Sequence, residues 1–163
     1  MVTKQAIRRE LIARRRALAE QSISRSSREV TARVLHVPDW QVARRAHIYT
    51  SQRGWGEIDT EQLRVYLLQR YPQLIIETSA TTTRAALPTH VYDVIIVPVL
   101  GFDTDGYRLG LGKGWYDRFL ATQPQALKIG LAYRWARLTQ LPHEPHDMPL
   151  DMILTEHDTM RRT

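Results

Sequence analysis

Residues 93–120, DVIIVPVLGFDTDGYRLGLGKGWYDRFL, decide the fold of this chain. They begin with a continuous apolar run, turn at Asp105-Gly106 and pass through a glycine-rich loop into a predicted helix over residues 113–122. An apolar run that does not alternate is typical of a strand covered on both faces, and therefore of a parallel sheet. A strand, a glycine loop and a helix start in this order favour an anion site, because free backbone N–H groups and the helix dipole attract negative charge.

The glycine loop has a composition suited to phosphate. Four of the chain's eight glycines lie within nine residues: Gly106, Gly110, Gly112 and Gly114. Arg108 and Lys113 lie among them, and Asp117 follows as a candidate ligand for the metal that accompanies phosphate. The spacing matches neither the Walker A loop nor the dinucleotide GxGxxG motif. The alternatives are a charged connection that aids solubility, for the loop, and an acid that pairs with the helix dipole, for Asp117.

The rest of the sequence alternates predicted helices and strands. We expect helices over residues 3–19, 24–36, 59–71 and 113–122, and strands over 46–51, 73–79, 93–100, 127–133 and 150–156. Thr3, Ser24 and either Asp59 or Thr60 are the expected N-caps. This alternation indicates a mostly parallel sheet with helices on both faces. Sites in such sheets lie at the carboxyl ends of the strands, here the loops after Ser51, Leu100 and Tyr133.

Composition excludes several classes of protein. The 163 residues fit one domain and include no cysteine, which rules out disulfides, thiolate zinc sites and cysteine nucleophiles. No apolar run approaches the roughly 18–20 residues that span a membrane. The amphipathic, arginine-rich N-terminus lacks the apolar segment of a secretory signal. We therefore expect a cytoplasmic protein.

The net charge of +6 is concentrated near the N-terminus. Residues 1–36 contain nine Lys and Arg against three acids, whereas the remainder has 14 of each sign. Nucleic-acid binding is one interpretation, but aromatic residues do not interleave with the basic ones there. Lys4 and Arg8 are four apart and share a helix face, so an anion between them would relieve their repulsion. Residues 14–16, three arginines, fit a solvated basic face better.

The segment HEPHD at residues 143–147 invites a zinc interpretation. It holds His143, Glu144, His146 and Asp147. The order differs from HExxH, and Pro145 breaks any helix that would align the histidines. Zinc is therefore disfavoured.

Several of these segments together resemble a known family. The stretch VPVLGFDTDGYRLGLGKGWYDRFL is similar to the signature of the 5-formyltetrahydrofolate cyclo-ligases. KQAIRRELIARRRAL resembles the opening helix of that family, and IYTSQRGWGEIDTEQL resembles its first strand and acidic segment. IGLAY and LPHEPHDMPLDMILTE resemble its closing portion, in the family's order. The resemblance implies a single-domain, three-layer α/β/α sandwich over residues 1–163.

The resemblance also implies an activity. Members use ATP and Mg²⁺ to convert 5-formyltetrahydrofolate into 5,10-methenyltetrahydrofolate. The formyl oxygen takes the γ-phosphoryl group, N10 attacks the formyl carbon, and phosphate leaves. We therefore expect ATP and a reduced folate as partners, neither nucleic acid nor a membrane, and a monomer or small homo-oligomer.

The matching positions give the expected site residues. The ATP-binding set is Lys4, Arg8, Arg108, Leu109, Gly110, Leu111, Gly112, Lys113, Gly114, Trp115 and Tyr116. Arg108 and Lys113 are the expected catalytic residues, Asp117 and Asp147 the magnesium ligands, and Thr50, Glu57 and Trp115 the folate-binding residues. Without the resemblance, Glu57 could equally be an acid at a helix entry.

One segment departs from the family pattern. Members usually carry a longer stretch where this chain has only YPQLIIETSATTTRAALPTHVY, with residues 72–92 shortened. Three interpretations follow: a compact active enzyme, an enzyme with another acceptor, or a paralogue that binds ATP without efficient turnover.

Overall fold

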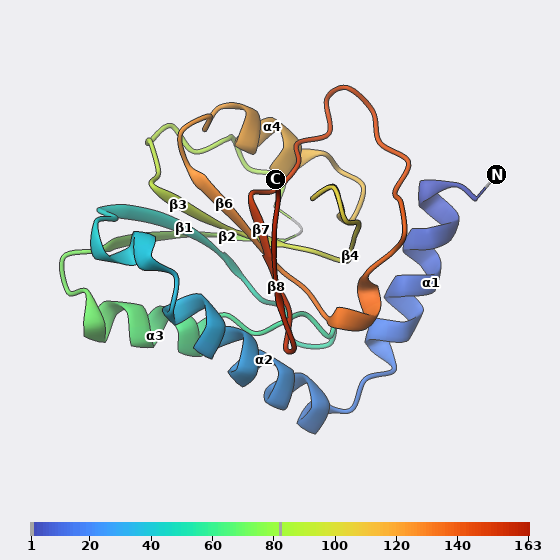
Figure 1. Cartoon of the computed structure of the whole chain (residues 1–163), viewed down its shortest axis with the longest axis horizontal. Helices are drawn as coiled ribbons and strands as arrows, with labels where there is room; N and C mark the ends of the chain where they lie inside the picture. The colour runs from blue at the N-terminus through green and yellow to red at the C-terminus, as the bar shows by residue number, and fades with distance from the viewer. Residues whose placement is uncertain (1, 82) are drawn as a thin grey trace.

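The centre of the molecule is a six-stranded sheet in which the apolar run of the glycine-loop stretch forms an inner strand. The structure, a computed structural model, describes residues 2–81 and 83–163. The strands lie in the order β2-β1-β3-β6-β7-β8 (Figure 1). Their bounds are Arg45–Thr50 (β1), Ile75–Ala80 (β2), Val94–Pro98 (β3), Leu127–Leu131 (β6), Met152–Leu154 (β7) and Thr159–Arg161 (β8).

Five of these strands are parallel, which brings their carboxyl ends to one edge of the sheet. Ala46 of β1 is paired with Val94 of β3, and Val94 in turn with Leu127 of β6. The last strand, β8, is antiparallel to β7 and was not predicted. The expected strand over residues 150–156 ends early, because the Thr155 hydroxyl accepts hydrogen bonds from two backbone N–H groups and turns the chain.

Helices cover both faces of the sheet, so the predicted three-layer α/β arrangement is confirmed. The helices are α1 (Lys4–Arg16), α2 (Glu20–Leu35), α3 (Glu61–Arg70) and α4 (Trp115–Ala121), with 3-10 turns η1 (Pro38–Gln41) and η2 (Arg134–Ala136). Figure 1 shows α2 and α3 on one side of the sheet and α4 on the other. Within residues 2–81 and 83–163, no helix is both long and apolar enough to cross a bilayer.

The helix starts follow the capping predictions only in part. Thr3 caps α1 as expected, with its hydroxyl accepting the Ala6 N–H at 3.2 Å. The second helix, α2, begins at Glu20, four residues before the predicted Ser24 cap, and its N-cap Ala19 makes no side-chain hydrogen bond. For α3, the N-cap is Thr60, but the Asp59 carboxylate accepts the Glu61 N–H.

The first helix, α1, is packed at the carboxyl edge of the sheet. Its Leu11 forms a small apolar cluster with Leu100, Leu109 and Leu141, separate from the main core around β3. Burying one such leucine contributes about 1.5–3 kcal/mol. The cluster therefore fixes the helix beside the glycine loop.

A short hairpin, missed by the sequence patterns, delivers the glycine loop. Its strands are β4 (Gly101–Phe102) and β5 (Arg108–Leu109). The buried Asp103 carboxylate accepts the N–H groups of Asp105 and Tyr107, while its other oxygen accepts that of Leu141. The turn predicted at Asp105-Gly106 is present, and Gly106 adopts a φ of 85° that other residues rarely take.

Candidate active site

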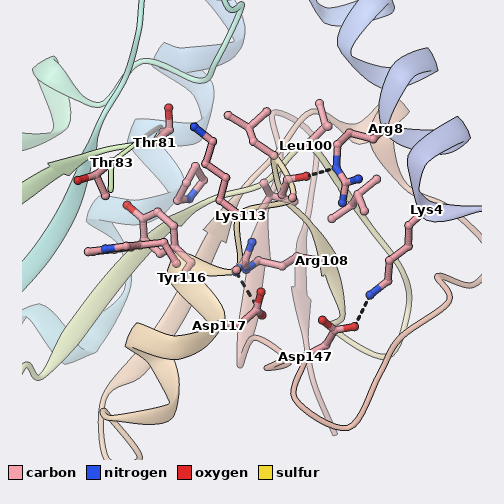
Figure 2. A pocket seen from close by; sticks show the side chains of 18 of the residues that line it. Lys4, Arg8, Thr81, Thr83, Leu100, Arg108, Lys113, Tyr116, Asp117 and Asp147 are labelled. Carbon is pink, nitrogen blue, oxygen red and sulfur yellow. Dashed lines mark hydrogen bonds and ion pairs between the residues drawn. The ribbon is translucent and has the colours of Figure 1, made fainter. Parts of the chain in front are cut away.

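A cavity of about 220 Å³ lies between α1 and the glycine loop (Figure 2). Two of the three loops predicted to hold the site, those after Ser51 and Leu100, supply residues to it. The third loop, after Tyr133, reaches the cavity only through residues further along, at 144–147. Of the predicted site residues, those that line the cavity are Lys4, Arg8, Glu57, Asp117, Asp147 and residues 108–116.

Thr50 is the one predicted site residue that the structure places elsewhere. It is the last residue of β1, is exposed, and does not line the cavity. Side chains alternate along a strand, and here Tyr49 is the buried member of the pair. Alternation along the strand therefore puts the Thr50 side chain on the opposite face of the sheet from Tyr49.

The glycine loop and α1 are in direct contact. The Arg8 Nε donates a hydrogen bond to the Gly110 carbonyl at 2.8 Å. A Cβ at Gly112 would lie 3.1 Å from the Arg8 guanidinium carbon, so a larger residue there would crowd it. The Lys4 ammonium pairs with the Asp147 carboxylate at the cavity mouth (Figure 2). Two basic residues of α1 thus contact the glycine loop and the segment that carries Asp147.

Arg108 lines the cavity and has an unused hydrogen-bond donor. Its side chain is only 5% exposed, and its Nη2 lies 3.3 Å from the Asp117 Oδ1. The Arg108 Nε is buried without a hydrogen-bond partner among the described residues. A buried polar group normally has a partner. An anionic oxygen in the cavity would supply one, so the residues present fit a phosphate group.

Lys113 completes the set of cations. Its side chain is exposed and extends toward Thr81 in Figure 2. No ion pair involves its ammonium within the part of the chain that the structure describes. Because α4 has only seven residues, the predicted helix dipole is small here. The attraction for an anion therefore comes mainly from the side-chain cations.

The two predicted magnesium ligands, Asp117 and Asp147, lie on connected segments. The Asp117 carboxylate accepts the N–H of Met148, the residue after Asp147, at 3.1 Å. Burial alone would raise the pKa of Asp147, but Lys4 and the Glu144 N–H hold it below its usual value. No group of three or more metal-ligating side chains occurs among the described residues. Two carboxylates are nonetheless sufficient for Mg²⁺, which usually keeps waters and phosphate oxygens as its other ligands.

The inner end of the cavity holds a buried ion pair, which corrects the prediction for Arg15. Arg15 is not part of a solvated face: its side chain is 4% exposed, and its Nη2 lies 3.8 Å from the Glu57 Oε1. Burial raises the pKa of Glu57, although the Gln52 N–H and Arg15 oppose the shift. The missed signal was helical spacing, since Arg15 lies seven residues after Arg8 and so on the same face.

The short loop after β2 forms another unpredicted wall. Thr81 and Thr83 line the cavity beside Glu57. The Trp115 indole N–H donates to the Ala85 carbonyl at 2.9 Å and so ties this loop to α4. Nothing in the spacing of residues 81–88 pointed to this role.

Known proteins resemble the chain over nearly its whole length. The model of the 5-formyltetrahydrofolate cyclo-ligase family matches residues 1–90 and 76–156. A 5-formyltetrahydrofolate cyclo-ligase of Mus musculus is 31% identical over 191 aligned positions, covering 94% of this chain and 93% of the relative. One of Escherichia coli is 30% identical, covering 87% and 94%. The mouse alignment exceeds 163 positions, so that protein contains residues this chain lacks, and the two family-model matches overlap in the segment predicted to be short.

Two solved structures share the fold. The 5,10-methenyltetrahydrofolate synthetase of Aquifex aeolicus has a TM-score of 0.78 and 26% identity, covering 97% of this chain and 92% of that one. A 5,10-methenyltetrahydrofolate synthetase from Mycoplasma pneumoniae has the same TM-score and 25% identity, covering 95% and 99%. Because the alignment covers nearly all of both chains, the Mycoplasma chain is about as short as this one. On the family match and the extent of these likenesses, the chain belongs to the 5-formyltetrahydrofolate cyclo-ligase family.

Proposed function

We propose that the protein is an ATP- and Mg²⁺-dependent enzyme that converts 5-formyltetrahydrofolate into 5,10-methenyltetrahydrofolate in the cavity between α1 and the glycine loop. The observation that carries the proposal is the convergence on this cavity of four cations besides the Arg15 paired with Glu57: Lys4 and Arg8 from α1 and Arg108 and Lys113 from the glycine loop. A triphosphate carries several negative charges, and phosphoryl transfer is catalysed mainly by alignment and charge neutralisation.

The roles of the loop cations follow from their surroundings. Arg108 is buried and held by Asp117, so its free Nε can donate to a phosphate oxygen in a fixed direction. Lys113 is exposed and unpaired within the described residues, which suits a side chain that closes over a bound nucleotide. Together they neutralise the charge on the transferring group. No side-chain nucleophile is required, because the formyl oxygen of the folate is itself the acceptor.

Asp117 and Asp147 are the proposed magnesium ligands. When bound, the ion would neutralise phosphate charge and orient the phosphate oxygens. Both carboxylates currently pair with cations of the same cavity, Arg108 and Lys4. Arrival of a triphosphate gives those cations a new partner, and this frees carboxylate oxygens for the metal.

Glu57 is the proposed folate contact at the inner end of the cavity. Its carboxylate is an acceptor for the N–H donors of a pterin ring, and it lines the cavity together with Thr81, Thr83 and Trp115. Thr50, exposed at the end of β1, stands apart from this wall. The short middle segment does not argue against activity, since a Mycoplasma protein of about the same length bears the name of a synthetase.

The test is an absorbance assay for methenyltetrahydrofolate with purified protein, ATP, Mg²⁺ and 5-formyltetrahydrofolate. We expect product only when all components are present, with one ADP released per product formed. Folded protein that binds MgATP but forms no product would overturn the proposal in favour of a paralogue without turnover. A parallel panel of other formyl or carboxyl acceptors, scored by ADP release, would then identify a different acceptor.

A further inference from the structure

We propose that Arg15 is a positioning residue, which acts on the folate through Glu57, and that α1 thereby serves both ends of the cavity. This inference rests on the proposed function. Arg15 has no predicted role in the site, and its side chain is as deeply buried as that of Glu57, 4% against 3% exposed.

The Arg15 side chain forms a hydrogen bond with the backbone of the loop that carries Glu57. The Arg15 Nε donates to the Trp55 carbonyl at 2.7 Å, two residues before Glu57. Gly56 lies so close to α1 that a Cβ there would be 2.4 Å from the Arg15 carbonyl oxygen, and its φ is +65°. From the other side, the Tyr133 hydroxyl donates to the Gly56 carbonyl at 2.8 Å. The loop is therefore clamped between α1 and the segment after β6.

Arg15 also favours the charged form of Glu57, together with the hydrogen bond from the Gln52 N–H and the neighbouring Thr81 hydroxyl. The groups that face this carboxylate are Arg15 from α1, Tyr49 from β1, Tyr116 from α4 and Tyr133 beyond β6. Burial raises the pKa of each tyrosine, so these hydroxyls stay neutral near pH 7. Arg15 is thus the cation among the described groups that opposes protonation of Glu57. A buried carboxyl without that cation tends to take up a proton and then accepts fewer hydrogen bonds from a ligand.

The helix spacing links this pair to the nucleotide end. Lys4, Arg8 and Arg15 are separated by four and then seven residues, about one and two helical turns, so they share one face of α1. The backbone distance from Lys4 to Arg15 is about 16 Å. One rigid helix therefore presents two cations to the triphosphate and a third to the folate-binding carboxylate.

The test separates the two ligands in the purified enzyme. We would measure the dissociation constants of 5-formyltetrahydrofolate and of MgATP, each without the other, for Arg15→Met and for Arg14→Met as control. Arg14 is the exposed neighbour whose guanidinium lies over the Trp135 ring. We expect Arg15→Met to weaken folate binding about tenfold for each unit by which the Glu57 pKa rises past the assay pH. MgATP binding should change less than about twofold, and Arg14→Met should match the wild type.

The pH dependence distinguishes positioning from a general loss of structure. The acid limb of kcat/KM for the folate should move to higher pH in Arg15→Met and return part of the way in Arg15→Lys. In a Glu57→Gln background, Arg15→Met should have a smaller further effect on folate binding, because position 57 is already neutral and only the hydrogen bond to the Trp55 carbonyl is lost. That background also keeps the test available if Arg15→Met alone fails to fold.

Two outcomes would overturn this inference and leave the proposed function intact. One is an active wild type whose folate affinity and pH profile are unchanged by Arg15→Met. The other is an equal loss of affinity for folate and MgATP. A folded wild type with no cyclo-ligase activity would instead overturn the proposed function.

Discussion

Two ion pairs at opposite ends of α1 have similar chemistry and differ in burial. Lys4 pairs with Asp147 at the mouth of the cavity, where the side chains are 26% and 16% exposed. Arg15 faces Glu57 at the inner end, where the values are 4% and 3%. Each pair joins a cation of the first helix to a carboxylate from a distant segment. The outer pair meets water and the inner pair does not.

The difference in burial predicts a difference in use. A partly exposed pair contributes about 0–1 kcal/mol and can be opened at little cost. Breaking a buried pair leaves an uncompensated charge and costs about 3–5 kcal/mol. The outer pair is therefore suited to exchange, with Lys4 passing to phosphate and Asp147 to magnesium, whereas the inner pair is suited to hold one geometry.

The largest effect should come from the two cations of the glycine loop. We expect Lys113→Ala and Arg108→Ala to lower kcat by about 10²–10³ or more, because each removes charge stabilisation from the transferring group. Lys113→Ala should leave the circular dichroism spectrum and melting temperature unchanged, because its side chain is exposed.

The matched control for this pair of variants is Arg44→Ala. Arg44 is exposed and precedes β1, at the edge of the sheet away from the cavity. A wild-type rate in either glycine-loop variant would remove that residue from the mechanism.

The next largest effect is a pH dependence of the free energy of unfolding. It comes from a histidine beneath α4, on the side of the nucleotide loop. His47 is fully buried against Trp115 and Phe119, and burial lowers its pKa to about 4. The folded state therefore binds fewer protons than the unfolded state below pH 6.5. Stability is complete above that pH and falls by about 1.4 kcal/mol per unit, or about 3 kcal/mol by pH 4.

Urea unfolding of wild type and His47→Gln at pH 7.5, 5.5 and 4.5 checks this prediction. The stability difference between the two proteins should shrink steadily as the pH falls, because only the wild type titrates at this position. Parallel pH profiles for the two proteins would show that His47 is protonated as easily in the fold as in the unfolded chain.

A smaller effect tests whether the carboxylates exchange their protein cations for Mg²⁺. Asp117→Asn should raise the Mg²⁺ concentration required for half-maximal activity by about tenfold, the range typical of lost support to a metal site. Asp147→Asn should act in the same direction, and Asp105→Asn serves as the control, because Asp105 is exposed and does not line the cavity. A metal titration that Asp117→Asn leaves unaltered would restore this residue to a purely structural partner of Arg108.

The smallest effect concerns the outer pair itself. Lys4→Met should change the free energy of unfolding by less than about 1 kcal/mol at pH 7. Because Lys4 holds the pKa of Asp147 below its usual value, the stabilisation is present above about pH 4 and disappears as the pH falls further. Urea titrations at pH 7 and pH 3 measure it. A loss of several kcal/mol would mean that the mouth is as rigid as the inner end.

The contrast between local sequence patterns and tertiary contacts explains what could be predicted from the sequence. The glycine loop, its cations and the parallel strands follow from local patterns, and the structure brings Lys4, Arg8 and Lys113 to one cavity. Local patterns failed where a tertiary contact decided the outcome. Arg15 is surrounded by arginines in the sequence, yet a distant Gly-Trp-Gly loop covers it.

Three further misses have similar physical reasons. The hairpin of β4 and β5 depends on one buried carboxylate, Asp103, whose partners extend to Leu141. Strand β8 depends on a turn made by the Thr155 hydroxyl, and the spacing of apolar residues does not predict that turn. Thr81 and Thr83 reach the cavity because Trp115 anchors their loop, a contact between segments about 30 residues apart.

The account stands on one triphosphate site built jointly by α1 and the glycine loop, and titration calorimetry with a non-hydrolysable ATP analogue and Mg²⁺ measures it most directly. We predict a single site per chain in the wild type, weakened about tenfold or more by either Arg8→Ala or Lys113→Ala. Binding that is absent from the folded wild type, or that both variants leave unchanged, would contradict it.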